Sequence, residues 1–354
     1  MAVRKCLKAI VPRGFAVEAD APQSTFLLVP EARTDNEQNR GMRSTFQHGA
    51  RAVLPIPVLW GNKKGAHRAP HSHTPLIQSP KPTANITNYS IKTQNRKFAH
   101  MNRLTFLGTG TSQGVPIVGC KCPICTSTDP RNKRLRTSAF LHTPQANILF
   151  DAGPDFRYQM LRAGITDFDA ILLTHEHRDH TGGLDETRSI NYFQKHIIPL
   201  YGNRETLQSV QQTLPYAFGE HRYPGAPEFQ LMEVGKEPFS INGLEFTPFE
   251  VHHFFCNKVV AYRTGDFTYI TDAKFIPPES EEIVKGTKTL VVNALREEPH
   301  PSHFSLGDAL AFIERIQPER AYITHMGHFL DYETTRRKLP ENVFLAYDGL
   351  QIEF

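Results

Sequence analysis

The sequence His-Glu-His-Arg-Asp-His, which begins at residue 175, places three imidazoles and a carboxylate within six positions. Imidazole nitrogen and carboxylate oxygen are ligands that zinc, manganese and iron share. The short apolar segment 169–173 precedes this run and is typical of a buried strand, so the run lies where that strand ends. A loop at a strand end can direct alternate side chains toward one point. We therefore expect His175 and His177 to bind one ion, and Asp179 and His180 to bind a second.

Further metal-binding residue types follow later segments with strand patterns. His252 and His253 follow an apolar segment, as do Asp272 and His325. Taken singly, a polar residue at a strand end is more often a cap or a satisfied polar group. Their recurrence at the ends of successive strands favours a site, because folds of this class gather functional groups there.

Three of the five cysteines form the pattern Cys120-x-Cys122-x-x-Cys125, whereas Cys6 and Cys256 are isolated and read as ordinary thiols. An odd number with this clustering favours metal ligation in a reducing compartment over a disulfide framework. Three thiolates still lack the fourth ligand of a tetrahedral zinc site. The pattern alone therefore leaves open three buried or redox-active thiols.

The elements that position these residues begin abruptly at Met101. Strand patterns cover 103–107, 138–142, 147–150, 169–173, 245–251, 259–263, 268–271, 289–292, 320–323 and 343–347. Helix patterns cover 156–163, 305–316 and 332–338, and Ser305 is the expected N-cap of the second of these. Strands interleaved with helices predict an α/β (α+β) layered domain over residues 101–354.

Residues 1–100 have a different composition. They contain 15 of the 40 Lys and Arg but 5 of the 36 Asp and Glu, a surplus of +10, which leaves a net charge of −6 for residues 101–354. Six prolines between residues 55 and 82 and the absence of a sustained apolar period predict a disordered or non-native extension. A wrongly assigned start codon, with Met101 as the true first residue, is an alternative. The acidic residues disfavour a basic targeting sequence.

The same charge count bears on partners and location. The basic pI reflects the first hundred residues and gives no reason to expect nucleic-acid binding by the rest. No apolar stretch is long enough to span a bilayer, and no apolar run of signal-peptide length is present. We expect a cytoplasmic protein that does not engage membranes.

Residues 101–354 resemble the metallo-β-lactamase superfamily, whose signature is His-x-His-x-Asp-His. Within it, they resemble the phosphoribosyl 1,2-cyclic phosphate phosphodiesterase group. The segments that carry the resemblance are 107–110, 119–125, 151–153, 175–180, 302–304, 324–328 and 347–349. The resemblance implies a four-layer αββα sandwich.

The resemblance also implies a set of metal ligands. One active-site ion would be bound by His175, His177 and His253, the other by Asp179, His180 and His325, with Asp272 bridging both. Of the two adjacent histidines, His253 is preferred over His252 because the family places its ligand two positions after an apolar strand residue. The ions would be zinc or manganese. His328 would complete a structural zinc site with Cys120, Cys122 and Cys125.

The chemistry implied is hydrolysis of a phosphodiester by a hydroxide shared between two ions. Asp179 and His303 are the expected catalytic residues. A histidine with an ordinary pKa of ~6.5 suits His303 as the general acid, with His300 as its competitor. Asp151 is expected to accept a hydrogen bond from a ligating imidazole. The stretch 108–112 lacks the lysine of a phosphate-binding loop and reads as a tight turn.

The expected substrate is a small cyclic phosphate such as phosphoribosyl 1,2-cyclic phosphate, and the resemblance implies a homodimer. One alternative is an RNA-processing endonuclease of the tRNA 3′-processing type, but residues 101–354 show no basic arm and are net acidic. Another is a zinc-stabilised binding module without catalysis, which would be expected to lack a ligand. A function as a β-lactamase or thioesterase would leave the three clustered cysteines unexplained. A function in cofactor biosynthesis, as in relatives of the same fold with their own cysteine cluster, is a further alternative.

Overall fold

The computed structural model describes residues 15–16, 29–30, 101–219, 222–254 and 257–354. The chain divides into two compact units, one of residues 1–10 and 92–354 and one of residues 11–91. In the second unit, β1 (Phe15–Ala16) and β2 (Val29–Pro30) pair antiparallel. Apart from these two strands, the expectation of disorder in residues 1–100 lies outside the described residues, as do Cys6 and Cys256.

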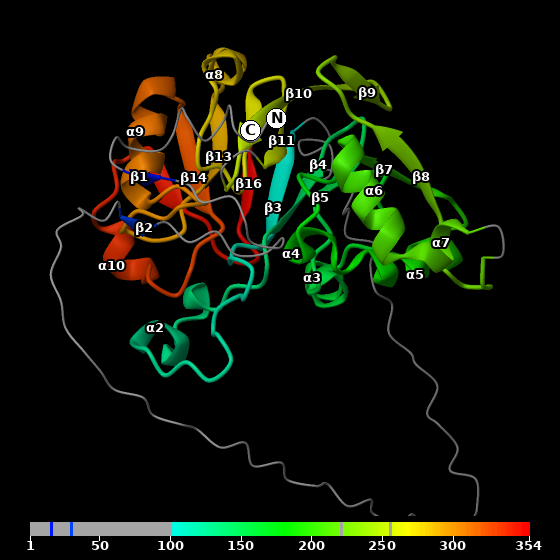
Figure 1. The fold of residues 1–354 in the computed structure, drawn as a ribbon, viewed down its shortest axis with the longest axis horizontal. Coiled ribbons are helices and arrows are strands. Elements are labelled where there is room, and N and C mark those ends of the chain that lie inside the picture. The colour runs from blue at the N-terminus through cyan, green and yellow to red at the C-terminus, as the bar shows by residue number, and fades with distance from the viewer. Residues whose placement is uncertain (1–14, 17–28, 31–100, 220–221, 255–256) are drawn as a thin grey trace, which may run out of the picture. The chain divides into compact units, whose positions relative to one another are not determined.

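One sheet of the first unit contains seven described strands in the order β16-β3-β4-β5-β6-β7-β8 (Figure 1). The bounds are β3 (Arg103–Gly108), β4 (Ser138–His142), β5 (Asn147–Phe150), β6 (Ala170–Leu172), β7 (Ile198–Gly202), β8 (Phe229–Glu233) and β16 (Gln351–Glu353). Pairing is antiparallel from β16 to β5 and parallel from β5 to β8. The histidine run follows β6, in the parallel half.

The other sheet contains seven described strands in the order β15-β14-β13-β12-β11-β10-β9. The bounds are β9 (Phe239–Ile241), β10 (Leu244–His252), β11 (Lys258–Thr264), β12 (Phe267–Tyr269), β13 (Thr289–Asn293), β14 (Arg320–Thr324) and β15 (Val343–Leu345). Pairing is antiparallel from β9 to β12 and parallel from β12 to β15.

Three clusters of buried apolar side chains separate four layers. The central cluster lies between the sheets, where Phe150 stacks on Tyr269 with ring centroids 4.5 Å apart. A second cluster joins the first sheet to its helices through side chains such as Met160 and Leu207, and a third joins the second sheet to side chains such as Phe312. The predicted αββα sandwich is therefore confirmed.

The helices flank the two sheets as Figure 1 shows. Beside the first sheet are α3 (Phe156–Ala163), α4 (Arg178–Thr181), η2 (Leu184–Thr187), α5 (Arg188–Gln194), α6 (Arg204–Thr213) and α7 (Pro215–Phe218). Beside the second are α8 (Pro278–Val284), α9 (Leu306–Ile316) and α10 (Tyr332–Arg336). The segment between β3 and β4 contains α2 (Pro123–Thr126) and the 3₁₀ turn η1 (Pro130–Asn132). No described helix has the length and apolar character needed to cross a bilayer.

Helix α9 begins where the sequence predicts. The Ser305 hydroxyl accepts a hydrogen bond from the Asp308 amide (3.1 Å), and the Asp308 carboxylate accepts one from the Ser305 amide (3.0 Å). This capping box satisfies two amides that the first helical turn leaves free. The start of α9 at Leu306 is thereby fixed three residues after His303.

Several elements differ from the sequence-based expectation. The predicted strand 268–271 is observed as β12, which ends at Tyr269, and the helix predicted to end at Lys338 ends at Arg336. The sequence patterns also assigned nothing to the region that forms α5, β7, α6, α7, β8 and β9, nor to α8.

Candidate metal centre

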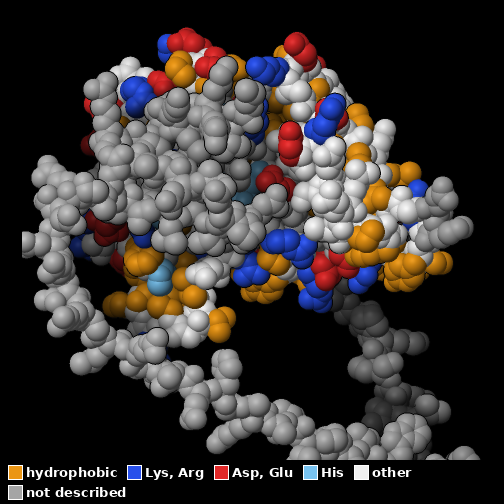
Figure 2. Space-filling model, in the orientation of Figure 1, with side chains coloured by type: hydrophobic (Ala, Val, Ile, Leu, Met, Phe, Trp, Pro, Cys, Tyr) orange, Lys and Arg blue, Asp and Glu red, His pale blue; other side chains and the backbone are white. Residues whose placement is uncertain are grey.

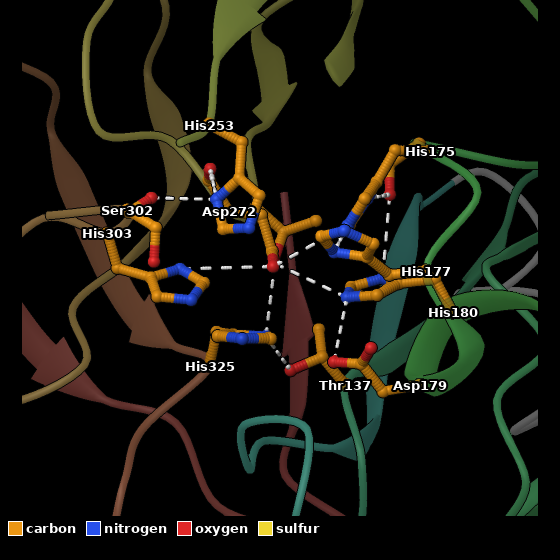
Figure 3. A network of polar contacts seen from close by, with 12 residues as sticks. Thr137, His175, His177, Asp179, His180, His253, Asp272, Ser302, His303 and His325 are labelled. Carbon is orange, nitrogen blue, oxygen red and sulfur yellow. Dashed lines mark hydrogen bonds and ion pairs between the residues drawn. The ribbon is translucent and has the colours of Figure 1, made fainter. Parts of the chain in front are cut away.

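The candidate ligands come from the ends of strands in both sheets. The histidine run follows β6 and continues into α4, whereas His253 directly follows β10 and His325 directly follows β14. Asp272 lies in the short connection after β12. Figure 3 shows these side chains converging on Asp272. The structure therefore brings together all seven residues expected at the dinuclear site.

Two donor sets share one carboxylate. Ligand atoms of His175, His177, His253 and Asp272 lie within 4.8 Å of one another, and so do those of Asp179, His180, Asp272 and His325. The His175 Nε2 atom is 3.7 Å from Asp272 Oδ2. By contrast, His180 Nε2 and His325 Nδ1 face Asp272 Oδ1, at 3.4 and 3.1 Å. Each oxygen of Asp272 thus faces a different set, which is the geometry that a bridging carboxylate requires.

Polar atoms at the centre indicate a cation. His180 Nε2 is buried and has no hydrogen-bond partner among the described residues, although Asp179 Oδ2 is 3.3 Å away. Burial opposes charge on His180, but Asp272, Asp151 and Asp179 outweigh it and raise its pKa well above the usual value. A buried pocket with several carboxylates is stable only when positive charge compensates them. The imidazole and carboxylate donors fit divalent metal ions.

Three residues of the site have left-handed backbone conformations. Asp151, Asp272 and His325 have φ values of 59°, 57° and 55°. Such angles are uncommon for residues other than glycine and cost of order 1–3 kcal/mol each, so they persist only where surrounding contacts enforce them. All three lie just after strands, at the edge where the ligands gather.

Hydrogen bonds behind the ligands orient the imidazole rings. Asp151 is fully buried and accepts hydrogen bonds from the Thr174 amide (2.8 Å) and hydroxyl (2.9 Å) and from His180 Nδ1 (2.7 Å). His253 Nδ1 lies 2.7 Å from the carbonyl oxygen of Ser302. Each contact fixes the proton on Nδ1, which leaves Nε2 free to bind a metal.

Only a residue without a side chain fits at position 153, after Asp151 and Ala152. A Cβ atom at this position would lie 2.1 Å from the backbone oxygen of Asp179. The Ala152 amide also donates to the backbone oxygen of His180 (2.8 Å). The segment 151–153 is therefore packed directly against the start of α4, and it supports Asp179 and His180 from behind.

The two adjacent histidines lie in different surroundings. His253 is buried in the first donor set, with its ring 5.1 Å from that of His177. His252 instead contacts Glu250 Oε1 through Nε2 (2.9 Å) and lies beside Phe275. Of the two, only His253 lies among the donor atoms.

His303 lies at the edge of the centre beside both donor sets. Its Nδ1 atom is 3.8 Å from Asp272 Oδ2, and its ring is 4.5 Å from that of His253 and 4.9 Å from that of His325. Burial lowers the pKa of His303 to about 3, which differs from the ordinary pKa expected from sequence. His300 stacks on it with ring centroids 5.4 Å apart.

Three cysteines and one histidine form a separate cluster. The Sγ atoms of Cys120, Cys122 and Cys125 lie 3.3, 3.5 and 3.5 Å from His328 Nδ1. Tetrahedral zinc with ordinary bond lengths gives sulfur–nitrogen separations of about 3.5 Å, so this geometry fits a structural zinc ion. Cys122 caps α2 and Cys125 lies within it, and Figure 2 shows apolar side chains gathered over this part of the molecule. Val118 and Phe329 are exposed nearby.

Arg134 is a structural residue that the sequence analysis missed. Its side chain is fully buried and donates to the backbone oxygens of Gly327 (2.8 Å) and Leu330 (2.6 Å). Burial lowers its pKa to about 10. It thereby holds the turn that carries His328. A lone arginine between a turn and a strand gives no sequence signal for this role.

Comparisons with known proteins identify similar chains. The family model described as "Beta-lactamase superfamily domain" matches residues 146–326. A solved structure described as a new diphosphatase from the PhnP family is 38% identical, with a TM-score of 0.67, and the match covers 72% of this chain and 97% of that one.

Two curated proteins are also similar over part of their length. An octanoyltransferase of Porphyromonas gingivalis is 38% identical over 70% of this chain and 51% of its own length. A ribonuclease Z of Bradyrhizobium diazoefficiens is 29% identical over 43% of this chain and 46% of its own. The chain thus spans about half the length of these curated relatives.

Proposed function

Because the chain belongs to the metallo-β-lactamase superfamily, and within it to the PhnP-like group, we propose that it is a metallohydrolase that cleaves phosphodiesters. The observation that carries the proposal is the pair of donor sets that share Asp272. Two metal ions held together supply a nucleophile from water at neutral pH and neutralise negative charge on a phosphoryl group. We assign His175, His177 and His253 to one ion and Asp179, His180 and His325 to the other, with Asp272 between them. The ions are zinc or manganese.

The remaining residues orient the ligands and handle protons. Asp151 and the carbonyl oxygen of Ser302 hold the rings of His180 and His253. We assign to His303 the donation of a proton to the leaving oxygen, because its ring borders both donor sets. Burial lowers the pKa of His303, and an anion beside the ring favours its protonated form. A substrate phosphate is such an anion.

The proposed substrate is a small cyclic phosphate such as phosphoribosyl 1,2-cyclic phosphate. Lys and Arg side chains gather over α3 and α4 in Figure 2, which suits a small anion. The domain is net acidic, with 25 basic and 31 acidic residues in 101–354, which disfavours a long nucleic-acid footprint. A similar ribonuclease Z makes RNA cleavage the second candidate. Homodimerisation and a cytoplasmic location stay predictions.

The test uses the full chain with zinc or manganese on three substrates. These are phosphoribosyl 1,2-cyclic phosphate, bis(p-nitrophenyl) phosphate and a precursor tRNA. We expect hydrolysis of the first two, lost in Asp272→Asn and retained in Asp266→Asn, a carboxylate that pairs with Lys288 on the surface. Cleavage of the tRNA alone would favour the RNA-processing alternative. Two bound ions without turnover of any substrate would favour the binding module.

A further inference from the structure

The turn 108–112, which begins at the last residue of β3, lies beside Met326, the residue after His325. The Thr109 backbone oxygen accepts a hydrogen bond from the Met326 amide (2.8 Å), and the Thr111 amide donates to the Met326 oxygen (3.2 Å). Gly110 and Met326 form a parallel bridge. The start of the domain therefore pairs with the backbone that carries a metal ligand from its far end.

This pairing supports a strained residue. His325 has a φ of 55°, which is unfavourable for a side chain with a Cβ atom. Residues on both sides of it are paired, since the Ala294 amide donates to the Thr324 oxygen (3.0 Å) and Met326 pairs with the turn. The left-handed conformation places Nδ1 of His325 3.1 Å from Asp272 Oδ1.

Two hydroxyl groups contact the ring of His325. Thr111 Oγ1 lies 3.2 Å from Nε2. Thr137 Oγ1 lies 3.0 Å from Nδ1, as Figure 3 shows. The Thr137 hydroxyl donates to the Gly110 oxygen (2.8 Å). Thr137 has no second hydrogen to donate, so its oxygen, like Asp272 Oδ1 at 3.1 Å, faces Nδ1 as an acceptor. A metal ion at Nδ1 would take the place of a proton there, and the remaining ring proton would then lie on Nε2, where Thr111 can accept it.

Asp348 fixes the turn from the C-terminal end of the chain. Its buried carboxylate accepts hydrogen bonds from the Thr109 amide (3.0 Å), the Thr109 hydroxyl (2.8 Å) and the Leu135 amide (2.9 Å). Arg162 forms an ion pair with it at 3.2 Å. Asp348 thus holds both segments that supply a hydroxyl to His325, the turn with Thr111 and the segment leading to Thr137.

We propose that the turn 108–112, fixed by Asp348, is a positioning element that sets the tautomer and orientation of His325 for metal binding. Thr111 and Asp348 are its positioning residues. The inference rests on the proposed function only in requiring that the second donor set binds a metal ion. It assigns to the glycine- and threonine-rich stretch a role in holding a ligand.

The test measures metal binding by the full chain carrying Thr111→Val, Thr111→Ser or Asp348→Asn. Each protein is loaded with Co²⁺, and the affinity of each site is measured by chelator competition together with the visible spectrum of the bound ion. We expect Thr111→Val to lower the affinity of the donor set that contains His325 about 10–100-fold and to change the spectrum of the ion bound there. The affinity of the donor set that contains His253 should be unchanged. Thr111→Ser, which keeps the hydroxyl, should restore both readouts.

A matched control is Thr213→Val, because the Thr213 hydroxyl bonds only to backbone oxygens of its own helix. Wild-type affinity and spectrum in Thr111→Val would overturn the proposal, as would equal losses in Thr111→Val and Thr111→Ser. If Asp348→Asn fails to fold, the comparison of Thr111→Val with Thr111→Ser still tests the proposal. Selective loss of one ion in a chain that cleaves no phosphodiester would support the positioning role and count against the proposed function.

Discussion

Replacing Asp151 by asparagine should weaken metal binding more than it disturbs the fold. Besides the Thr174 hydroxyl, the carboxylate accepts from two donors that lie on different oxygens, the Thr174 amide on Oδ1 at 2.8 Å and His180 Nδ1 on Oδ2 at 2.7 Å. An asparagine in the same position keeps an acceptor oxygen on only one of these two sides. The Thr174 amide always carries its proton and must donate, whereas His180 can move its proton from Nδ1 to Nε2 and accept instead.

The asparagine oxygen should therefore remain on Thr174, and its amide group should donate to His180 Nδ1. That arrangement moves the His180 proton to Nε2, the atom that faces Asp179 and Asp272. Changes of this kind behind a metal ligand cost about 10–100-fold in affinity, or about 1.4–2.8 kcal/mol. If the tautomer did not change, an unpaired buried donor would instead cost about 1–3 kcal/mol of folding stability.

Isothermal titration with zinc and chelator competition would measure the two affinities, and thermal unfolding in excess chelator would measure the fold separately. Asp169→Asn is the matched control, because Asp169 also accepts from a backbone amide, that of Asn147 at 2.7 Å, but lies away from the site. Wild-type affinity for both ions in Asp151→Asn would refute the tautomer argument. A loss of stability with unchanged metal affinity would refute it equally.

Three further outcomes are expected. Gly153→Ala should lower the free energy of unfolding by about 1–3 kcal/mol or more, because the new Cβ would lie 2.1 Å from a backbone oxygen. Each kcal/mol lost should lower the melting temperature by roughly 2–4 °C. His253→Ala should lower the bound metal per chain, measured by mass spectrometry of the metals, whereas His252→Ala should not; equal losses would contradict this. In chelator-treated protein, Cys122 should react with iodoacetamide with a midpoint near pH 6, because the Cys125 amide lowers its pKa to about 6, and thiolate forms as the pH rises through that value. Cys125, whose pKa is raised by burial, should need alkaline pH, and identical profiles would count against that assignment.

The sequence was sufficient to anticipate the positions of the donor residues. His175 to His180 follow an apolar strand within one short segment, and such local patterns survive in the fold because strand ends meet at one edge. The capping pattern at Ser305 is likewise local, since its partner Asp308 is three residues away.

Contacts between distant segments could not be anticipated in the same way. The burial of Arg134 depends on carbonyl groups nearly 200 residues later in the chain, and Asp348 acts on a turn 239 residues before it. The left-handed backbone at His325 follows from such pairings as well. The missed helix α6 differs, because the Asn203 side chain caps it by accepting from the Thr206 amide, a signal that the sequence does contain.

The cluster of three cysteines with His328 joins positions 203–208 residues apart. An ion bound there acts like a cross-link that closes a loop of this length, and loop-closure entropy alone makes such a constraint worth about 5 kcal/mol against the unfolded chain. The ring cannot close until the ribosome has released the segment that carries His328. Until then the three cysteines lack their fourth ligand, so an ion bound there would constrain the domain only after the strands of both sheets that lie between the two segments have been made.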